Sequence, residues 1–211
     1  MVPAAPWRST IDAVLWCHPA APVARDALPA QLAGRAGLPL TIGGLVSYRE
    51  GPVGPYAEIL GAPILLRPLV AHVPFIAVDS QRGIAGGRGN WALPKILARF
   101  EGDIGRPGRA TAAGDGWAVV VTATARRRSL PLAGGLRCVQ VWPDGRPREF
   151  SVRVRGNARL GHAEVAHAAA SPLAEWLVAG RHPAILLSGV QDVLAPRREA
   201  GRRDERARHE K

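Results

Sequence analysis

The residue that most invites chemistry is Lys95, which stands in the apolar context Trp91-Ala-Leu-Pro94-Lys95-Ile-Leu. The chain has one other lysine, Lys211 at its end, and draws nearly all of its positive charge from arginine. Arginine stays protonated at any working pH, whereas a desolvated lysine amine can lose its proton and attack a carbonyl carbon. The sequence therefore points to amine chemistry at Lys95. The alternative is an ordinary exposed lysine, which is the commonest kind in proteins.

Length and composition predict one folded domain and a polar tail. With 211 residues, of which 47% are hydrophobic, the chain can fill a single core, which we assign to residues 1–195. Residues 196–211 are charged and lack apolar periodicity, so we expect a disordered tail. This tail contributes part of the net charge of +11. Because no nucleic-acid recognition motif accompanies that charge, specific binding of nucleic acid ranks last among the functions considered.

Cysteines and apolar runs argue against several other classes of protein. Cys17 and Cys138 form no CxxC pair, so the sequence predicts neither a metal site nor a disulfide framework, and a reducing compartment is the default. The first residues lack the apolar stretch of a signal peptide, and no apolar run reaches the roughly 18 residues of a membrane span. We therefore expect a cytoplasmic protein without a membrane segment.

The elements that must position Lys95 are mostly β-strands. Short apolar or alternating runs predict strands over residues 11–16, 38–48, 56–66, 73–78, 117–124, 136–142, 149–155 and 185–193. We expect short helices over residues 22–32, 84–87 and 171–178, the second of them capped by Asp79 or Ser80. Pro143-Asp144-Gly145 predicts a hairpin turn, and Arg126-Arg127-Arg128 is interpreted as a solvated loop. The expected fold is α+β and mostly antiparallel, a closed or cone-like β-barrel with few peripheral helices.

A glycine-rich stretch, Gly86-Gly-Arg-Gly-Asn90, leads directly into Trp91 and Lys95. It lacks the spacing of a phosphate loop or a dinucleotide fingerprint, so nucleotide binding is not expected. Together with Gly54-Pro-Tyr56-Ala-Glu58, it resembles the acetoacetate decarboxylase family. In that family a tyrosine is followed two residues later by a glutamate, and then come a Gly-Arg-bearing helix, an aromatic residue and Pro-Lys. The resemblance extends over residues 8–196, including a later strand at 115–124 and a hairpin at 141–149.

The resemblance implies a double-layered β-barrel or cone that encloses the reactive lysine and forms homo-oligomers. Lys95 occupies the position of the Schiff-base lysine, and Glu58 occupies that of the acid/base glutamate. Arg8 corresponds, with a one-residue gap, to the family arginine that engages the substrate.

Three further residues near the motif are candidates for the substrate site. Tyr56 and Trp91 are expected to be walls of the pocket or part of the core rather than reactive groups. For Arg88 we prefer a role in holding the turn through hydrogen bonds to carbonyl groups, with substrate binding as the alternative.

The sequence also departs from the family pattern at three places. Ile96 replaces a second lysine, Gly43 or Gly44 replaces a second glutamate, and Gly89 replaces the acid of the Gly-Arg-Glu stretch. Acetoacetate decarboxylase is itself the standard example of a lysine activated by an apolar pocket or a cationic neighbour. Without that cation, desolvation is the route that remains, and burial can lower a lysine pKa by up to about 3 to 5 units.

These residues predict a Schiff-base-forming lyase that acts on a small keto acid and needs no metal or organic cofactor. The favoured reaction is decarboxylation of an acetoacetate-like β-keto acid through a Lys95 iminium ion. The loss of one glutamate keeps open aldol or dehydration chemistry on pyruvate-like substrates. It also keeps open a protein that binds keto acids without turning them over.

Overall fold

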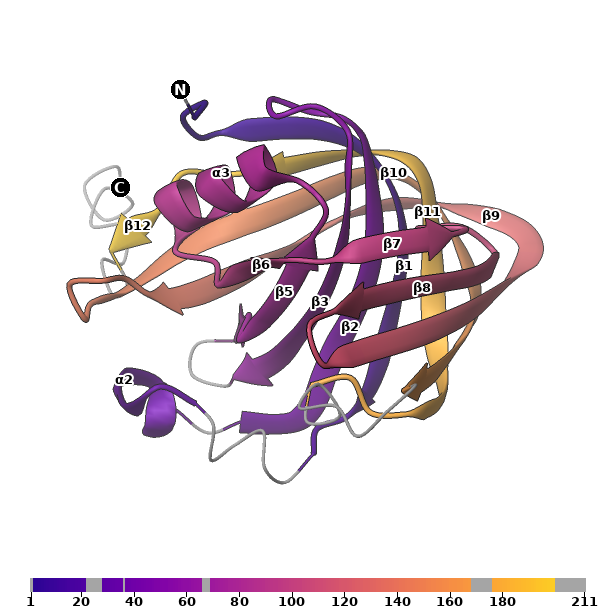
Figure 1. The fold of residues 1–211 in the computed structure, drawn as a ribbon, viewed down its shortest axis with the longest axis horizontal. Helices are drawn as coiled ribbons and strands as arrows, with labels where there is room; N and C mark the ends of the chain where they lie inside the picture. Colours follow the sequence, from indigo (N-terminus) through magenta and orange to yellow (C-terminus); the bar gives the residue numbers. More distant parts are fainter. Residues whose placement is uncertain (1, 22–27, 36, 66–68, 168–175, 200–211) are drawn as a thin grey trace, which may run out of the picture.

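The computed structural model describes residues 2–21, 28–35, 37–65, 69–167 and 176–199 (Figure 1). It contains the helices α2 (Ala30–Ala33) and α3 (Gln81–Trp91). The strands are β1 (Trp7–Pro19), β2 (Gly37–Glu50), β3 (Tyr56–Leu65), β4 (Val70–His72), β5 (Phe75–Val78), β6 (Lys95–Leu97), β7 (Arg99–Gly102), β8 (Gly108–Gly114), β9 (Trp117–Val141), β10 (Pro147–His167), β11 (Gly180–Leu194) and β12 (Arg198–Glu199). Among these described residues, no helix is long and apolar enough to cross a membrane.

All twelve strands belong to one sheet. Ten of them follow the order β12-β10-β11-β1-β2-β3-β4-β9-β8-β7, and beside this path β5 pairs with β3 and β6 pairs with β5. Because β10 also pairs with β9, the strands from β10 through β1 to β9 close into a ring. Neighbouring strands are antiparallel except at the pairs β4–β9 and β5–β6. The expected architecture, mostly antiparallel β with few helices, is confirmed, although the ring is less regular than a simple barrel (Figure 1).

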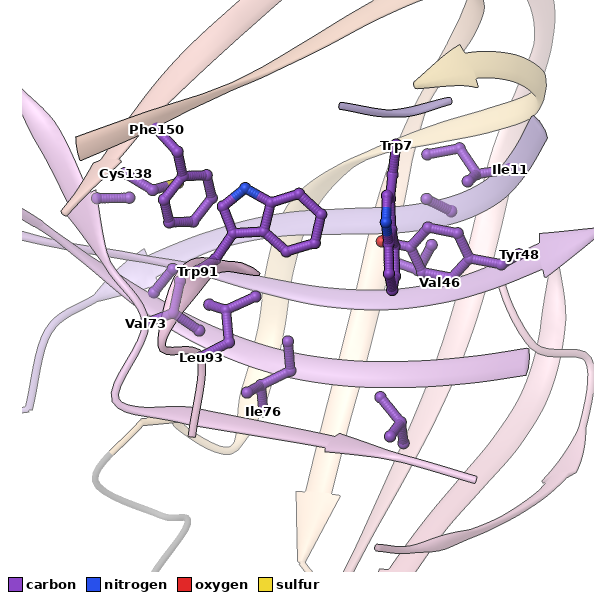
Figure 2. Packing of buried hydrophobic residues seen from close by; sticks show 14 of the residues in the cluster. Trp7, Ile11, Val46, Tyr48, Val73, Ile76, Trp91, Leu93, Cys138 and Phe150 are labelled. Atoms are coloured by element: carbon purple, nitrogen blue, oxygen red, sulfur yellow. The ribbon is translucent and has the colours of Figure 1, made fainter. Parts of the chain in front are cut away.

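The middle of β1 buries both of its faces, because successive side chains of a strand point to opposite sides. On β1, Ala13 belongs to one cluster of buried apolar residues and Val14 to another. We call these clusters the first core and the second core. Figure 2 shows part of the first core, which includes Trp7, Ile11, Val46, Tyr48, Ile76, Trp91 and Leu93. The second core joins the ring to the outer strands β7 and β8 and includes Val14, Trp16, Leu45, Ile59, Phe75, Ala110 and Trp117.

The second half of the chain forms longer strands than its sequence predicts. The predicted strands over residues 117–124 and 136–142 are parts of β9, which has 25 residues. Arg126, Arg127 and Arg128 lie inside β9 with exposed side chains, so their interpretation as a loop was wrong. Where both faces of a strand are exposed to solvent, arginines can occupy every position. Such a segment shows no alternation of apolar and polar residues, so the sequence does not identify it as a strand. The predicted hairpin turn is confirmed, because Gly145 N–H donates to the Trp142 carbonyl between β9 and β10.

The helices required more correction than the strands. The described part of the predicted helix over residues 22–32 is the single turn α2, and residues 22–27 lie outside the described chain. Residues 176–178 form a turn rather than the end of a helix, and residues 171–175 are not described. Helix α3 is longer than predicted and contains the whole glycine-rich stretch. In the segment where disorder was expected, β12 pairs with β10.

Candidate active site

Lys95 is the first residue of β6, shortly after helix α3 ends. Ser80 caps this helix as predicted, since its hydroxyl accepts a hydrogen bond of 3.0 Å from Gly83 N–H. β6 pairs in parallel with β5, and this pairing sets Lys95 beside Ile76, a residue of the first core. The Lys95 side chain therefore enters the first core, where only 3% of the residue is exposed.

Two glycines of α3 make room for the side chains around Lys95. A methyl group on Gly87 would lie 2.6 Å from Cδ and 2.7 Å from Cε of Lys95. A methyl group on Gly86 would overlap the indole ring of Trp7. The glycine-rich stretch is thus a helix that packs closely against the lysine, which gives it a physical role other than phosphate binding.

The Lys95 amine contacts the carboxylate of Glu58, which β3 carries into the same core. The distance from Lys95 Nζ to Glu58 Oε2 is 2.7 Å, and Glu58 is also 3% exposed. Glu58 lies opposite Val46 in the β2–β3 register, and Val46 is a member of the first core. The structure therefore brings together the two residues that were predicted to be catalytic, as a buried and hydrogen-bonded ion pair.

Two stacked tyrosines cover this ion pair. The rings of Tyr48 and Tyr56 lie 4.2 Å apart at an angle of 11°. Lys95 Nζ lies 3.4 Å from the Tyr56 hydroxyl and 5.1 Å from the centre of its ring, while Tyr48 donates a bond of 3.5 Å to Glu58 Oε1. Burial first, and then the charge of Glu58, raise the pKa of both phenols well above 10. Both tyrosines are therefore neutral hydrogen-bond donors at any working pH.

Sequence reasoning missed a second acidic residue, Asp192 of β11. Only 2% of it is exposed, and its Oδ1 atom has no hydrogen-bond partner among the residues that the structure describes. Burial is the largest cause that raises the pKa of Asp192, to about 7, and the nearby charge of Glu58 raises it further. Hydrogen bonding by Val193 N–H and the charge of Lys95 oppose this rise. In the sequence, Asp192 was simply an acidic residue within the strand predicted over residues 185–193. Alternation alone could not say which face of that strand it occupied.

The remaining predicted residues have different positions. Arg8 is exposed, because Trp7 and Ser9 on either side of it are buried and a strand alternates its faces. Arg8 therefore points away from the core that holds Lys95, and the structure does not bring the two together. Trp91 is buried, packs edge-on against Trp7 at 5.0 Å, and donates a hydrogen bond of 2.8 Å to the Ala195 carbonyl.

Arg88 makes the carbonyl contact that we preferred for it. Its Nε and Nη2 atoms donate hydrogen bonds of 3.0 and 2.7 Å to the carbonyl oxygen of Lys95. This fork ties the last turn of α3 to the first residue of β6, and so fixes the backbone from which the lysine projects.

The two glycines at the position of the missing glutamate lie on opposite faces of β2. A side chain on Gly43 would overlap the Trp16 indole in the second core. A methyl group on Gly44 would come within 3.1 Å of Leu15 Cδ2 and 3.3 Å of Leu60 Cγ, both of which pack against the first core. Neither position has room for a carboxylate without rearrangement.

The described residues contain no group of three or more His, Cys, Asp or Glu that could hold a metal ion. Two of the three buried histidines among the described residues, His18 and His72, lie against carbonyl groups, at 2.9 Å from Pro19 O and 3.0 Å from Val139 O. Burial lowers the pKa of both, so they are neutral near pH 7. Burial also raises the pKa of the Cys138 thiol to about 12.

Comparison with known proteins gives the fold but no family by sequence. No family model and no curated protein matches the chain. Among solved structures, an acetoacetate decarboxylase has a TM-score of 0.68 at 14% identity, covering 92% of this chain and 88% of that one. The acetoacetate decarboxylase of Legionella pneumophila has a TM-score of 0.68 at 16% identity, covering 92% and 86%. The enduracididine biosynthesis enzyme MppR, complexed with pyruvate, has a TM-score of 0.64 at 16% identity, covering 94% and 91%. The chain therefore has the acetoacetate decarboxylase-like fold.

Proposed function

We propose that this protein is a Schiff-base-forming enzyme that acts on a small keto acid, with Lys95 as the nucleophile and Glu58 as the adjacent base and acid. The observation that carries the proposal is the contact of 2.7 Å between Lys95 Nζ and Glu58 Oε2 inside the first core. The shared fold of acetoacetate decarboxylase and of the pyruvate-bound enzyme supports small keto acids as the substrate class.

The first half of the reaction forms the Schiff base. Lys95 passes one proton to Glu58, and the free amine adds to the ketone carbon of the substrate. A proton then moves from the new ammonium nitrogen to the alkoxide oxygen, which gives a carbinolamine. Glu58 protonates the hydroxyl group, which leaves as water while the nitrogen lone pair forms the C=N⁺ bond. The iminium cation then stands beside the Glu58 carboxylate, so the Lys95–Glu58 pair ends this half of the reaction with the same net charge of zero with which it began.

The second half breaks a bond next to the iminium carbon. In an acetoacetate-like β-keto acid the iminium accepts the electron pair of the carbon–carbon bond, CO2 leaves, and a neutral enamine remains. One proton must then reach the enamine carbon to regenerate an iminium ion. Hydrolysis by water releases the ketone and restores the Lys95 ammonium group. No step of this scheme requires a metal or an organic cofactor.

The surroundings of Lys95 favour decarboxylation over reactions that retain the carboxylate. Lys95 is the one buried lysine or arginine among the described residues. The described part of the core therefore offers no arginine that could pair with the carboxylate of a bound substrate. A carboxylate is costly in an apolar interior, whereas CO2 is neutral. Decarboxylation of an acetoacetate-like acid is therefore the reaction we favour. The structural neighbour in complex with pyruvate is also known in complex with the condensation product of pyruvate and imidazole 4-carboxaldehyde, which supports aldol chemistry on pyruvate-like substrates, with dehydration as a related reaction, as the alternative.

Borohydride trapping tests the proposal directly. The protein is incubated with acetoacetate or pyruvate, reduced with borohydride, digested and mapped by mass spectrometry. We expect the reduced adduct on Lys95 and none on Lys211, which serves as an internal control because it is the only other lysine. Lys95→Arg should abolish the adduct. An adduct that persists in Lys95→Arg, or no adduct with any small keto acid, contradicts the proposal.

The products then distinguish the reactions. Release of CO2 from acetoacetate supports the favoured decarboxylation. Condensation of pyruvate with an aldehyde, without release of CO2, supports the alternative. An adduct on Lys95 with no product from either substrate indicates a protein that binds keto acids without turnover.

A further inference from the structure

Asp192 is a buried carboxyl group that the proposed reaction has not yet used. Its Oδ1 atom has no hydrogen-bond partner within the described part of the chain, although the residue is 98% buried and most buried polar atoms are paired. We propose that Asp192 is the second acid of the Lys95 site and holds the proton that is delivered to the enamine carbon. This inference rests on the proposed Schiff-base function.

The strand register directs Asp192 toward Lys95. Before residue 188, β11 sends Leu186 into the second core and Leu187 into the first. Ala13 of β1 lies opposite Leu187, and Ile11 lies opposite Val190, so β11 carries one residue more than β1 between these pairs. This bulge reverses the alternation, and even-numbered residues after it face the first core, as Val190 does.

The immediate neighbours of Asp192 leave its carboxyl group without a counter-ion. It lies opposite Ser9 of β1, which is buried between Trp7 and Ile11 on the first-core side. On the other flank it lies opposite Val154 of β10, which packs against the same core. Neither neighbour titrates. The titratable groups that act on Asp192 from the remaining elements are Tyr48 of β2, Tyr56 and Glu58 of β3, and Lys95 of β6.

Glu58 and Asp192 are therefore two buried carboxyl groups near a single cation, Lys95. Lys95 contacts Glu58 at 2.7 Å, and none of the described lysines and arginines makes such an ion pair with Asp192. Two nearby carboxylates in an apolar site do not both ionise readily, and the one without the cation keeps the proton. The pKa of Asp192, raised to about 7, agrees with this division. Glu58 is then the partner of the amine, and Asp192 is the acid.

The proton balance requires such a second acid. After water has left, Glu58 is a carboxylate beside the iminium cation, and loss of CO2 gives a neutral enamine. Asp192 donates its proton to the enamine carbon, whose C=C electron pair forms the new C–H bond. The products are an iminium ion and the Asp192 carboxylate. Hydrolysis frees the ketone and the Lys95 ammonium group, and Asp192 recovers one proton from solvent, which is the proton that decarboxylation consumes overall.

Pyruvate separates proton transfer from Schiff-base formation. In D2O, the pyruvate iminium loses a methyl proton and regains a deuteron, so wash-in of deuterium into the methyl group measures this step. We expect Asp192→Asn to keep the borohydride adduct on Lys95 and to slow the wash-in by roughly 10² to 10⁴-fold, the usual contribution of a general acid or base. Asp115→Asn, at an exposed turn residue, is the matched control and should leave both measurements unchanged.

Infrared spectroscopy tests the proton itself without any substrate. We expect the carbonyl band of a protonated carboxyl group to titrate near pH 7 in the wild type and to be absent from Asp192→Asn. If Asp192→Asn fails to fold, Asp192→Ser replaces it in both experiments. Unchanged wash-in with a normal adduct, or an Asp192 that is already ionised at pH 5, overturns the inference and leaves the proposed function intact. The absence of an adduct in the wild type contradicts the proposed function instead.

Discussion

Two buried aspartates on neighbouring strands, Asp12 of β1 and Asp192 of β11, have opposite surroundings. Asp12 is 0% exposed, and its carboxylate accepts hydrogen bonds from Arg49, from Arg106 at 3.0 Å and from Gly189 N–H at 2.8 Å. Burial alone raises the pKa of Asp12, but these donors outweigh burial and lower the pKa below its usual value. Asp192 is equally buried and has a raised pKa. Burial thus does not set the charge of a carboxyl group by itself, because its hydrogen-bond donors decide the outcome.

The two aspartates are also connected through the backbone. Arg49 is the extra residue of a bulge in β2, and Gly189 lies in the bulge of β11. The Asp12 carboxylate therefore accepts hydrogen bonds from one residue in each of the two bulges beside it, the Arg49 side chain and the Gly189 N–H. Since the β11 bulge turns Asp192 toward the first core, the ionised aspartate stabilises the geometry that positions the protonated one.

The largest effect on stability should come from breaking the paired aspartate. Asp12→Ala leaves Arg49 and Arg106 without their carboxylate and removes the acceptor of Gly189 N–H. Because Arg49 and Arg106 are themselves 40% and 59% exposed, they stay hydrated, and the loss comes from the broken hydrogen bonds. We expect a loss of about 2 to 4 kcal/mol in the free energy of unfolding, measured by urea denaturation at pH 7. Asp115→Asn at an exposed position should change it little. A loss as small as that of Asp115→Asn contradicts the structural role of Asp12.

Removing the unpaired aspartate should have the opposite sign. At pH 8 a group whose pKa is raised from 3.8 to about 7 costs the folded state up to about 4 kcal/mol. The asparagine amide that replaces the carboxyl group is also costly to bury, so the substitution recovers only part of this free energy. We therefore expect Asp192→Asn to stabilise the protein by about 1 to 3 kcal/mol at pH 8 in urea denaturation. Destabilisation at pH 8 contradicts a poorly paired Asp192.

The two effects should disappear over different ranges of pH. The folded pKa of Asp12 is lowered, so its contribution is present above about pH 4 and is lost as the pH falls through the folded value. The folded pKa of Asp192 is raised, so its cost is absent below about pH 4 and grows up to about pH 7. Thermal unfolding at pH 5 should thus retain most of the Asp12→Ala difference and little of the Asp192→Asn difference. Parallel pH profiles for the two variants contradict this assignment.

A smaller effect should follow from strain at the bulge that joins the two sites. Gly189 has a φ of +60°, a conformation that costs other residues about 1 to 2 kcal/mol. No atom lies within 4 Å of a methyl group added there, so conformation alone opposes Gly189→Ala. We expect a loss of about 1 to 2 kcal/mol in urea denaturation. Gly134→Ala is the matched control, since it is equally open and has no positive φ.

The sequence predicted the part of the site that lies in local motifs. Lys95, Glu58 and Tyr56 stand in short runs that resemble those of a known family, and the structure brings all three together. Arg8 was assigned to the substrate by its resemblance to a family arginine, matched with a one-residue gap, whereas the alternation of β1, which begins at Trp7, turns Arg8 outward. Asp192 was missed because its direction depends on a bulge, and no residue pattern in β11 announces the extra residue.

The strands of the fold were more predictable than their lengths. Val- and Thr-rich alternation marked the buried half of β9, but its exposed half contains arginines and has no apolar period. The glycine-rich stretch was expected to follow a short helix and instead lies inside α3. Gly86 and Gly87 pack against Trp7 and Lys95, which lie outside the helix. Helix propensity takes no account of such contacts, so it did not predict a helix through these glycines.

The edge-to-face pair of Trp7 and Trp91 places two fluorescent side chains close to the Lys95 site. Trp91 belongs to the helix that packs on Lys95, and its indole N–H is anchored to the Ala195 carbonyl at the end of the chain segment that carries Asp192. Indole emission depends on the polarity and the charges around the ring. If a keto acid reacts at Lys95 as proposed, its binding should change the tryptophan fluorescence, which would follow the step without a label or a coupled assay.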